Sequence, residues 1–265
     1  MSFINTIARL NLLPLWRRRL YVWNFEFASP SLDRLTALFL HKLNLLGKPE
    51  KIFFTRNLKP GMTVVDIGAN QGLYSLLFSR LVGAEGVVIA FEPEPDMFAA
   101  LETNIAANSV ENVECHRLAI GSKSDQAMLS RSLIHGGDNR LSSGHSEQIS
   151  TKKPVRVATL DDIVGDRKVD FIKMDVQGWE WEAFRGMERT IDRNRDIGIH
   201  FEFWPAGLRD SGCDPLELLK FLSQQKFQIY RSGGGGETQL RDFSLLLSEL
   251  SGNKFTNLYA RRDRE

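Results

Sequence analysis

The chain has 265 residues, of which 42% are hydrophobic and 25% charged, a composition typical of a folded globular protein. Its 34 Lys and Arg side chains are balanced by 33 Asp and Glu, so the formal net charge is +1. A protein that binds nucleic acid through phosphates usually carries a clear basic excess, so we expect no nucleic-acid partner. The length suits one α/β domain with an extension.

Residues 1–57 are expected to form a helical appendage. Ser31 after Pro30 is a suitable helix cap, and apolar residues recur at helical spacing from Leu35 to Leu46, before Gly47. The stretch before Ser31 mixes apolar and aromatic residues with arginines. Residues 1–25 are therefore a candidate for peripheral contact with an anionic membrane or for a lid over a substrate. The alternative is a helix packed on the main domain or on the second subunit of a homodimer.

From Gly61 onward, short β-rich runs alternate with helical patterns, which predicts one domain over residues 58–265 with a parallel sheet covered by helices. A glycine run at 233–236 is expected to be a mobile turn. The polar, aperiodic segment 133–150 is expected to be a long loop. The predicted strands are 63–67, 86–91, 113–118, 169–174 and 197–203, with 227–231 and 257–261 as an antiparallel pair. The predicted helices are 73–81, 97–108, 179–191, 216–225 and 244–250. Gly83 is expected to end the first of them, and Asp214 with Pro215 to begin the fourth.

Neither a membrane span nor a disulfide framework is expected. No run approaches the roughly 18 to 20 uncharged apolar residues of a membrane-spanning helix. Cys115 and Cys213 show no CxxC or Cys–His spacing, so no zinc site is predicted either. The apolar N-terminus precedes its arginines, the reverse of the order in a signal peptide. We therefore expect a cytoplasmic protein.

The first chemical motif is TVVDIGANQGLYSLLF, in which a strand runs through a glycine turn into a helix. Such a turn lets a ligand approach the backbone and the helix N-terminus. When the dinucleotide fingerprint G-x-G-x-x-G is laid over Gly68, Asn70 and Leu73 fall on its second and third glycines. A pyrophosphate needs the second of these positions without a side chain. NAD, and with it an oxidoreductase, is therefore disfavoured.

Two acids indicate S-adenosylmethionine, which carries an ammonium and a sulfonium but no phosphate. Asp66 precedes the turn, where a carboxylate repels a pyrophosphate and attracts a cation. Glu92 follows the second strand, 24 positions after Gly68, close to the separation at which an acid binds a ribose hydroxyl pair. We expect Asp66 to act indirectly on the methionine end of this cofactor and Glu92 to bind its ribose.

Five motifs together resemble the FkbM family of S-adenosylmethionine-dependent methyltransferases: VVDIGANQG, FEPEP at 91–95, LAIGS at 118–122, TLDDI at 159–163 and FIKMDVQGWEWEAFRG at 171–186. The resemblance covers roughly residues 60–205. It implies a class I methyltransferase (Rossmann-like) fold with a seven-stranded sheet whose last strand is antiparallel. It also implies methylation, most often of a hydroxyl on a sugar or natural product. The implied cofactor contacts are Asp66, Gly68, Asn70, Gly72 and Glu92, with Ala119 and Ile120 beside the adenine.

One residue departs from the family pattern. Gln177 stands where the D-V-E-G run of the family has an acid, whereas Asp175, Gly178 and Glu180 fit. The change puts any role of a carboxylate at this position in doubt. It also weakens a metal hypothesis, because only Asp175 and Glu202 then offer convincing oxygen ligands. No metal is expected.

Methyl transfer to a neutral alcohol benefits from a base near the hydroxyl proton. In an open parallel sheet the site lies beyond the carboxyl ends of the strands. Alternation places Lys173 and Asp175 on one face of the fourth strand, and His200 and Glu202 on one face of the fifth. Asp175, His200 and Glu202 are therefore candidate catalytic residues, with His200 the one that ordinarily titrates near neutral pH. Lys173 is expected to pair with one of the acids.

The segment 133–150 supplies a further base candidate, His135, and the Asp138–Asn139–Arg140 trio that could bind acceptor hydroxyls if the segment is a lid. Three tryptophans either stack on a sugar or pack in the core: Trp179, Trp181 and Trp204. The expected function is O-methylation of a carbohydrate or of a glycosylated or lipid-linked metabolite. The alternatives are a non-catalytic S-adenosylmethionine-binding regulatory partner and a methyltransferase acting on nitrogen or a small natural product.

Overall fold

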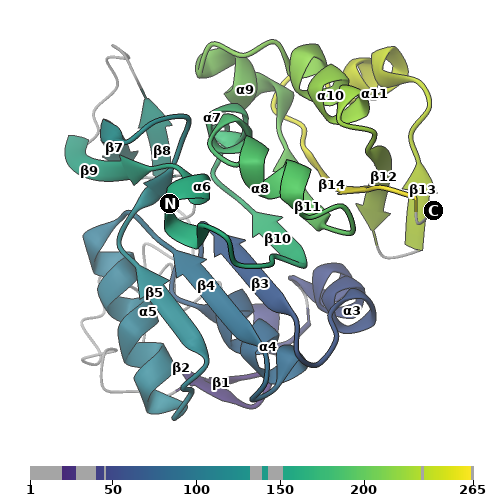
Figure 1. Ribbon diagram of the computed structural model, residues 1–265. Coiled ribbons are helices and arrows are strands. Elements are labelled where there is room, and N and C mark those ends of the chain that lie inside the picture. The colour runs from purple at the N-terminus through teal and green to yellow at the C-terminus, as the bar shows by residue number, and fades with distance from the viewer. Residues whose placement is uncertain are drawn as a thin grey trace, which may run out of the picture.

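The computed structural model describes residues 20–27, 40–44, 46–131, 139–142, 152–233 and 236–263. Its centre is an eight-stranded sheet with the strand order β13-β12-β14-β11-β10-β3-β4-β5 (Figure 1). The strands from β5 to β11 in this order run parallel, and β14 lies antiparallel between β11 and β12. Their bounds are β3 Thr63–Ile67, β4 Val87–Phe91, β5 Val113–His116, β10 Phe171–Met174, β11 Gly198–Phe203, β12 Gln228–Gly233, β13 Gly236–Gln239 and β14 Thr256–Arg261.

The predicted α/β fold with an antiparallel last strand is confirmed, but the sheet has eight strands where seven were expected. The additional strand is β13, which forms a hairpin with β12 and pairs Gly233 with Gly236. The glycine run expected to be a mobile turn therefore contributes residues to two paired strands. Residues 234–235, at its tip, lie outside the described part.

Helices cover both faces of the sheet, because the strand residues that point to either face are apolar. Val64 and Val65 in β3 belong to two different buried clusters. One face is covered by α3 (Lys48–Asn57), α4 (Leu73–Val82) and α5 (Pro95–Ala107). The other is covered by α6 (Leu160–Val164), α7 (Glu180–Arg185), α8 (Glu188–Arg193), α9 (Pro205–Asp210), α10 (Pro215–Gln224) and α11 (Phe243–Glu249).

Several predicted helix ends are confirmed by their caps. Asp214 caps α10 by accepting a hydrogen bond from the Leu216 amide at 3.0 Å, and Gly83 ends α4. The helix predicted over 179–191 is instead two helices, α7 and α8. A Cβ on Gly186, between them, would lie only 2.0 Å from the carbonyl oxygen of Gly121. The predicted helix is interrupted at Gly186, where its backbone lies close to that of Gly121.

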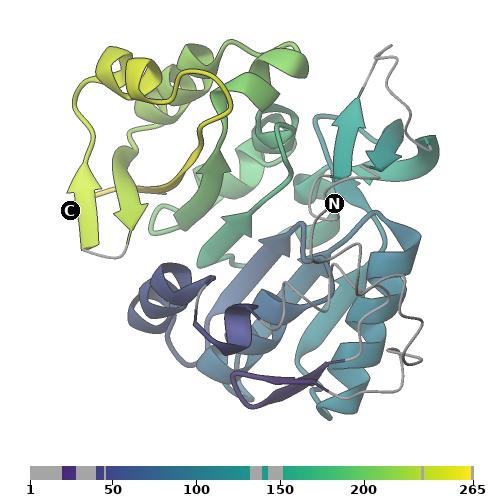
Figure 2. The same cartoon turned by 180° about the vertical axis from the view of Figure 1, so that it is seen from behind.

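The expectation of a wholly helical appendage is wrong for residues 20–27, which form a hairpin of β1 (Leu20–Val22) and β2 (Phe25–Phe27). Both residues of its turn, Trp23 and Asn24, have positive φ, as a two-residue type I′ turn requires. Val22 and Phe27 are fully buried in the cluster that contains Phe54 of α3. The hairpin packs against α4 and α5, on the same side of the sheet as α3 (Figure 2).

Most of the helix expected over 31–47 lies outside the described residues. Within the described part, Leu43 and Leu46 are 50% and 44% exposed, so they do not form its expected buried face. Gly47 begins α3, which was not predicted, from a left-handed conformation with φ 67°. No helix within the described ranges is long and apolar enough to cross a membrane.

A second sheet of four strands, in the order β6-β9-β7-β8, adjoins the main one near α6 and α7 (Figure 1). It consists of β6 (Ala119–Ile120), β7 (Asp125–Arg131), β8 (Asn139–Ser142) and β9 (Lys152–Ala158). The long loop predicted over 133–150 is therefore interrupted by a strand. The remainder of that segment, with His135 and Asp138, lies outside the described residues.

Candidate active site

The loop after β3 is held in a conformation that requires glycine. Gly68, Asn70 and Gly72 have φ of 79°, 54° and 90°, in the left-handed region. A Cβ on Gly68 would lie 2.0 Å from the carbonyl oxygen of Asp175, and one on Gly72 would lie 2.7 Å from Leu101 Cδ1. The loop therefore leads into α4, and its backbone packs closely against the backbone of Asp175, which follows β10.

Glu92 ties this loop to the end of β4. Its Oε2 accepts a hydrogen bond from the Asn70 amide at 2.8 Å, and its Oε1 accepts one from the Glu94 amide at 2.9 Å. Glu92 thus lies beside the glycine turn, where the predicted contact with ribose requires it.

Asp66 is fully buried and faces two partners of its own. Ser75 Oγ donates a hydrogen bond to its Oδ2 at 2.6 Å, and Lys173 Nζ lies 3.2 Å from its Oδ1. Lys173 also donates to the carbonyl oxygen of Gly68 at 3.1 Å. Burial opposes the charge of Lys173, but attraction to Asp66 and then Asp175 raises its pKa overall. Lys173 therefore pairs with an acid, but with Asp66 and not with Asp175 or Glu202 as expected. Asp66 reaches the glycine loop indirectly, through this lysine.

Three polar side chains meet at the carboxyl ends of β10 and β11. Gln177 Nε2 donates hydrogen bonds to Asp175 Oδ1 at 2.8 Å and to Glu202 Oε2 at 3.0 Å. All three residues are partly exposed. The structure thus brings together Asp175 and Glu202, as alternation along the strands predicted, and adds Gln177 between them.

The turn that carries Asp175 and Gln177 is fixed from below by Glu180. Its Oε1 accepts hydrogen bonds from the amides of Gly178 at 3.2 Å and Val176 at 3.4 Å. Glu180 is fully buried, and this burial raises its pKa to about 7 although the backbone amides favour the charged form. Glu180 was expected only to fit the family motif, and no role was predicted for it. Its sequence signal was an acid two residues after Gly178, between Trp179 and Trp181.

His200 does not join this group. Its imidazole is 4% exposed and packs against Phe53 and Phe54 of α3, with ring centroids 4.8 and 5.0 Å away. Burial, and secondarily Lys173, lowers its pKa to about 3. The base role expected for His200 does not fit this placement, because the ring is covered by α3 and too weakly basic. The second base candidate, His135, lies outside the described residues.

Ala119 and Ile120 are almost fully buried, in two different apolar clusters. Their expected position beside adenine stays a prediction, in which their backbone, and not their buried side chains, would contact the adenine. Trp179 and Trp204 are also buried, which favours the core-packing alternative for both. Trp181 packs edge-on against Phe221 at 5.6 Å. In the described part of the chain, no group of three or more His, Cys, Asp or Glu side chains could hold a metal ion.

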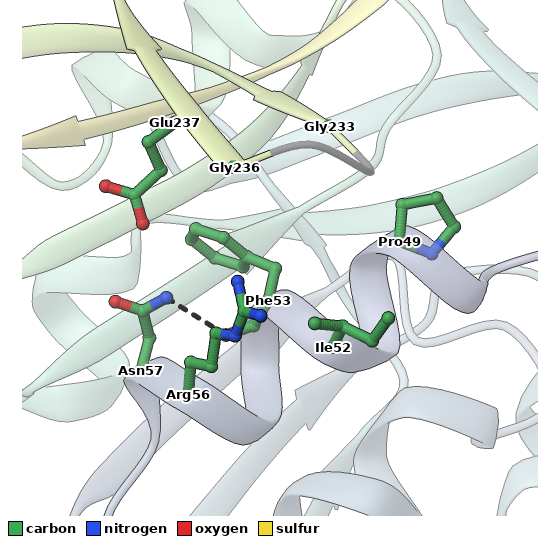
Figure 3. Close-up of a pocket in the computed structure, with 8 residues that line it drawn as sticks. All are labelled: Pro49, Ile52, Phe53, Arg56, Asn57, Gly233, Gly236 and Glu237. Carbon is green, nitrogen blue, oxygen red and sulfur yellow. Dashed lines mark hydrogen bonds between the residues drawn. The ribbon is translucent and has the colours of Figure 1, made fainter.

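A pocket lies between α3 and the β12–β13 hairpin (Figure 3). Apolar Phe53 and Ile52 line it together with the charged Arg56 and Glu237. Strand pairing places Glu237 three strands along the sheet from Glu202, which is about 14 Å at the usual strand spacing. Glu237 of this pocket therefore does not belong to the group formed by Asp175, Gln177 and Glu202.

Comparison with known proteins gives the family. The model of the methyltransferase FkbM domain matches residues 66–229. The chain belongs to the FkbM methyltransferase family. It is 24% identical over 182 residues to Methyltransferase 1 of Beauveria bassiana, a match that covers 61% of this chain and 71% of the relative. The protein is a class I methyltransferase with S-adenosylmethionine as its cofactor.

A solved structure agrees with this fold. A protein from Clostridium thermocellum assigned as an rRNA methylase superimposes with a TM-score of 0.51 at 14% identity, covering 82% of this chain and 97% of its own. A Streptococcus mutans protein assigned as a methyltransferase, in complex with SAH, has a TM-score of 0.48 at 10% identity, covering 80% and 95%. The glycine loop, the α4 N-terminus and Glu92 form a donor and acceptor set that fits S-adenosylmethionine.

Proposed function

We propose that this FkbM methyltransferase transfers its methyl group to a hydroxyl of a carbohydrate, or of a glycosylated or lipid-linked metabolite. The observation that carries the proposal is the pair of carboxylates, Asp175 and Glu202, joined by Gln177 beside the glycine loop. S-adenosylmethionine supplies an electrophilic methyl group when bound. A neutral hydroxyl needs a base within hydrogen-bond reach, and a partly exposed carboxylate provides one.

Asp175 is the better placed of the two carboxylates to receive the proton. Its own backbone packs on Gly68 of the glycine loop, so it is the residue of the pair that adjoins this loop. Glu202 comes from the neighbouring strand and would orient the acceptor through a second hydroxyl. Two carboxylates offer acceptor atoms only, which suits a partner rich in O–H donors and disfavours an anionic group at this point.

We further propose that the protein acts in the cytoplasm and that, of residues 1–25, those that precede the packed β1–β2 hairpin make peripheral contact with an anionic membrane. The cytoplasmic assignment is supported by two free thiols, Cys115 and Cys213. The membrane contact is supported by the apolar and arginine-rich sequence of this stretch. Flotation with vesicles of anionic or neutral lipid tests it, because binding that is equal for both, or absent, would exclude an electrostatic contact.

Isothermal titration with S-adenosylmethionine and NAD, followed by methyl transfer from tritiated cofactor, tests the proposed function. Candidate acceptors are the neutral glycan, lipid-linked and small-metabolite fractions of a lysate from the source organism. We expect binding of S-adenosylmethionine only, and label in a hydroxyl-bearing product. Label that appears only in products methylated on nitrogen would contradict the hydroxyl assignment, while failure to bind S-adenosylmethionine would contradict the cofactor.

A further inference from the structure

Gln177 occupies a position that is unusual for an uncharged side chain, because both of its side-chain partners are carboxylates. Its Nε2 lies 2.8 Å from Asp175 Oδ1 and 3.0 Å from Glu202 Oε2. Carboxylates only accept hydrogen bonds, so the nitrogen of the amide, and not its oxygen, must face them. The two hydrogens of this nitrogen serve one carboxylate each.

We propose that Gln177 is the positioning residue of the acceptor site, and that its amide takes the place a shared proton or divalent cation would occupy between Asp175 and Glu202. This inference rests on the proposed function, since it assigns the two carboxylates to the acceptor. It also explains why the two carboxylates can lie close together, because the side-chain amide of Gln177 holds them at a fixed separation.

The chemistry favours an amide over the other two solutions. Two bonds of these lengths to one nitrogen place the carboxylate oxygens about 5 Å apart, where like charges repel unless something lies between them. A shared proton would remove one of the two bases. A divalent cation would engage the oxygens of both. An amide donates one hydrogen bond to each carboxylate and carries no charge, so it separates the two without consuming a base or adding a cation.

The backbone holds Gln177 on both sides. Gln177 is left-handed, with φ 54°, and the following Gly178 has φ 98°. The amides that flank Gln177, those of Val176 and Gly178, both donate to the buried Glu180. A Cβ on Gly178 would lie 2.7 Å from the Gly207 backbone, so the turn is also packed from outside. The backbone of Gln177 is therefore held in place, and its side chain extends from this fixed position to the two carboxylates.

This placement makes an acceptor-independent prediction for Q177E. The substitution preserves the size of the side chain but brings a third carboxylate between Asp175 and Glu202, which creates the oxygen ligand set that the wild type lacks. Mn²⁺ is the probe, detected by electron paramagnetic resonance. Q224E, on the exposed surface of α10, adds the same charge away from the site and serves as the matched control. We expect Q177E to bind Mn²⁺ at least about tenfold more tightly than the wild type and Q224E.

A second variant tests the effect on the reaction. Q177L retains a similar volume but has no N–H, so we expect the turnover of the labelled acceptor to fall at least about tenfold, with the affinity for S-adenosylmethionine within about threefold of the wild type. The thermal midpoint of each variant verifies that it is folded. Q177E provides the answer if Q177L does not fold.

The outcomes separate this proposal from the proposed function. Mn²⁺ affinities within about threefold of one another in the wild type, Q224E and Q177E would overturn the role of Gln177, as would a folded Q177L with wild-type turnover. Titration of S-adenosylmethionine on the same preparations tests the cofactor independently. Wild-type protein that fails to bind it would instead overturn the proposed function.

Discussion

Replacing Glu180 with Gln is expected to stabilise the protein at alkaline pH and to have little effect near pH 5. The carboxyl group is fully buried, and its pKa is raised from 4.5 to about 7, chiefly by desolvation. The native state therefore holds its proton more tightly than the unfolded chain does. Stability from this group is fully present below pH 4.5 and is lost as the pH rises through about 7.

The magnitude follows from the size of the shift. One pKa unit corresponds to 1.36 kcal/mol, so the difference between 4.5 and about 7 corresponds to about 3 kcal/mol of unfolding free energy between pH 4 and pH 9. The side-chain amide of the E180Q variant would keep an oxygen that accepts from the Val176 and Gly178 amides, but would never ionise. The wild type alone should therefore lose this free energy on titration.

Urea unfolding of both proteins between pH 5 and pH 9 measures the effect. E188Q, at an exposed position in α8, is the matched control and should change the unfolding free energy by less than about 0.5 kcal/mol at every pH. A difference between E180Q and the wild type that stays constant across this range would refute the reasoning. It would mean that Glu180 does not change its protonation in the folded state.

Three further predictions concern the cofactor and the acceptor. G68A should weaken S-adenosylmethionine binding at least about tenfold in calorimetry, because its Cβ would lie 2.0 Å from the Asp175 carbonyl oxygen. The control G61A is also at positive φ but has nothing within 4 Å of the added Cβ, so it should bind the cofactor normally. Equal affinities of the two variants would contradict the assignment of the glycine loop to the cofactor. D175N should lower turnover by a factor of about 10² to 10⁴ with cofactor affinity within about threefold, and undiminished turnover would remove Asp175 as the base. H200Q should leave the shape of the pH–rate profile unchanged because the wild-type imidazole is already neutral above its pKa of about 3, so loss of a limb near pH 6.5 would restore His200 as a base.

Much of the main sheet could be predicted because its signals are local. Alternation and glycine turns marked β3, β4, β10 and β11, and Asp214 with Pro215 marked the start of α10. The β13 strand, the β1–β2 hairpin and the small sheet were missed. Their strands are short or polar, and their conformation is decided by pairing with distant segments, which a local pattern does not contain.

The residues of the candidate site likewise include some that a local pattern could predict and others that it could not. Alternation along two parallel strands was enough to bring Asp175 and Glu202 to one edge. It could not reveal that α3, an unpredicted helix, covers His200 with Phe53 and Phe54. Nor could it show that Gln177, which stood out as a departure from the family pattern, adopts a left-handed conformation and so reaches both acids.

The measurement that tests the central claim most directly follows the transferred carbon. The protein would be incubated with S-adenosylmethionine labelled with ¹³C in the methyl group and the acceptor-containing fraction, and the product examined by carbon–proton correlation NMR. We expect a methyl carbon bonded to oxygen, formed by the wild type and lost in the D175N/E202Q double variant, which still binds the cofactor. A methyl carbon bonded to nitrogen, or the same oxygen-bonded product formed undiminished by the double variant, would contradict the proposed O-methylation.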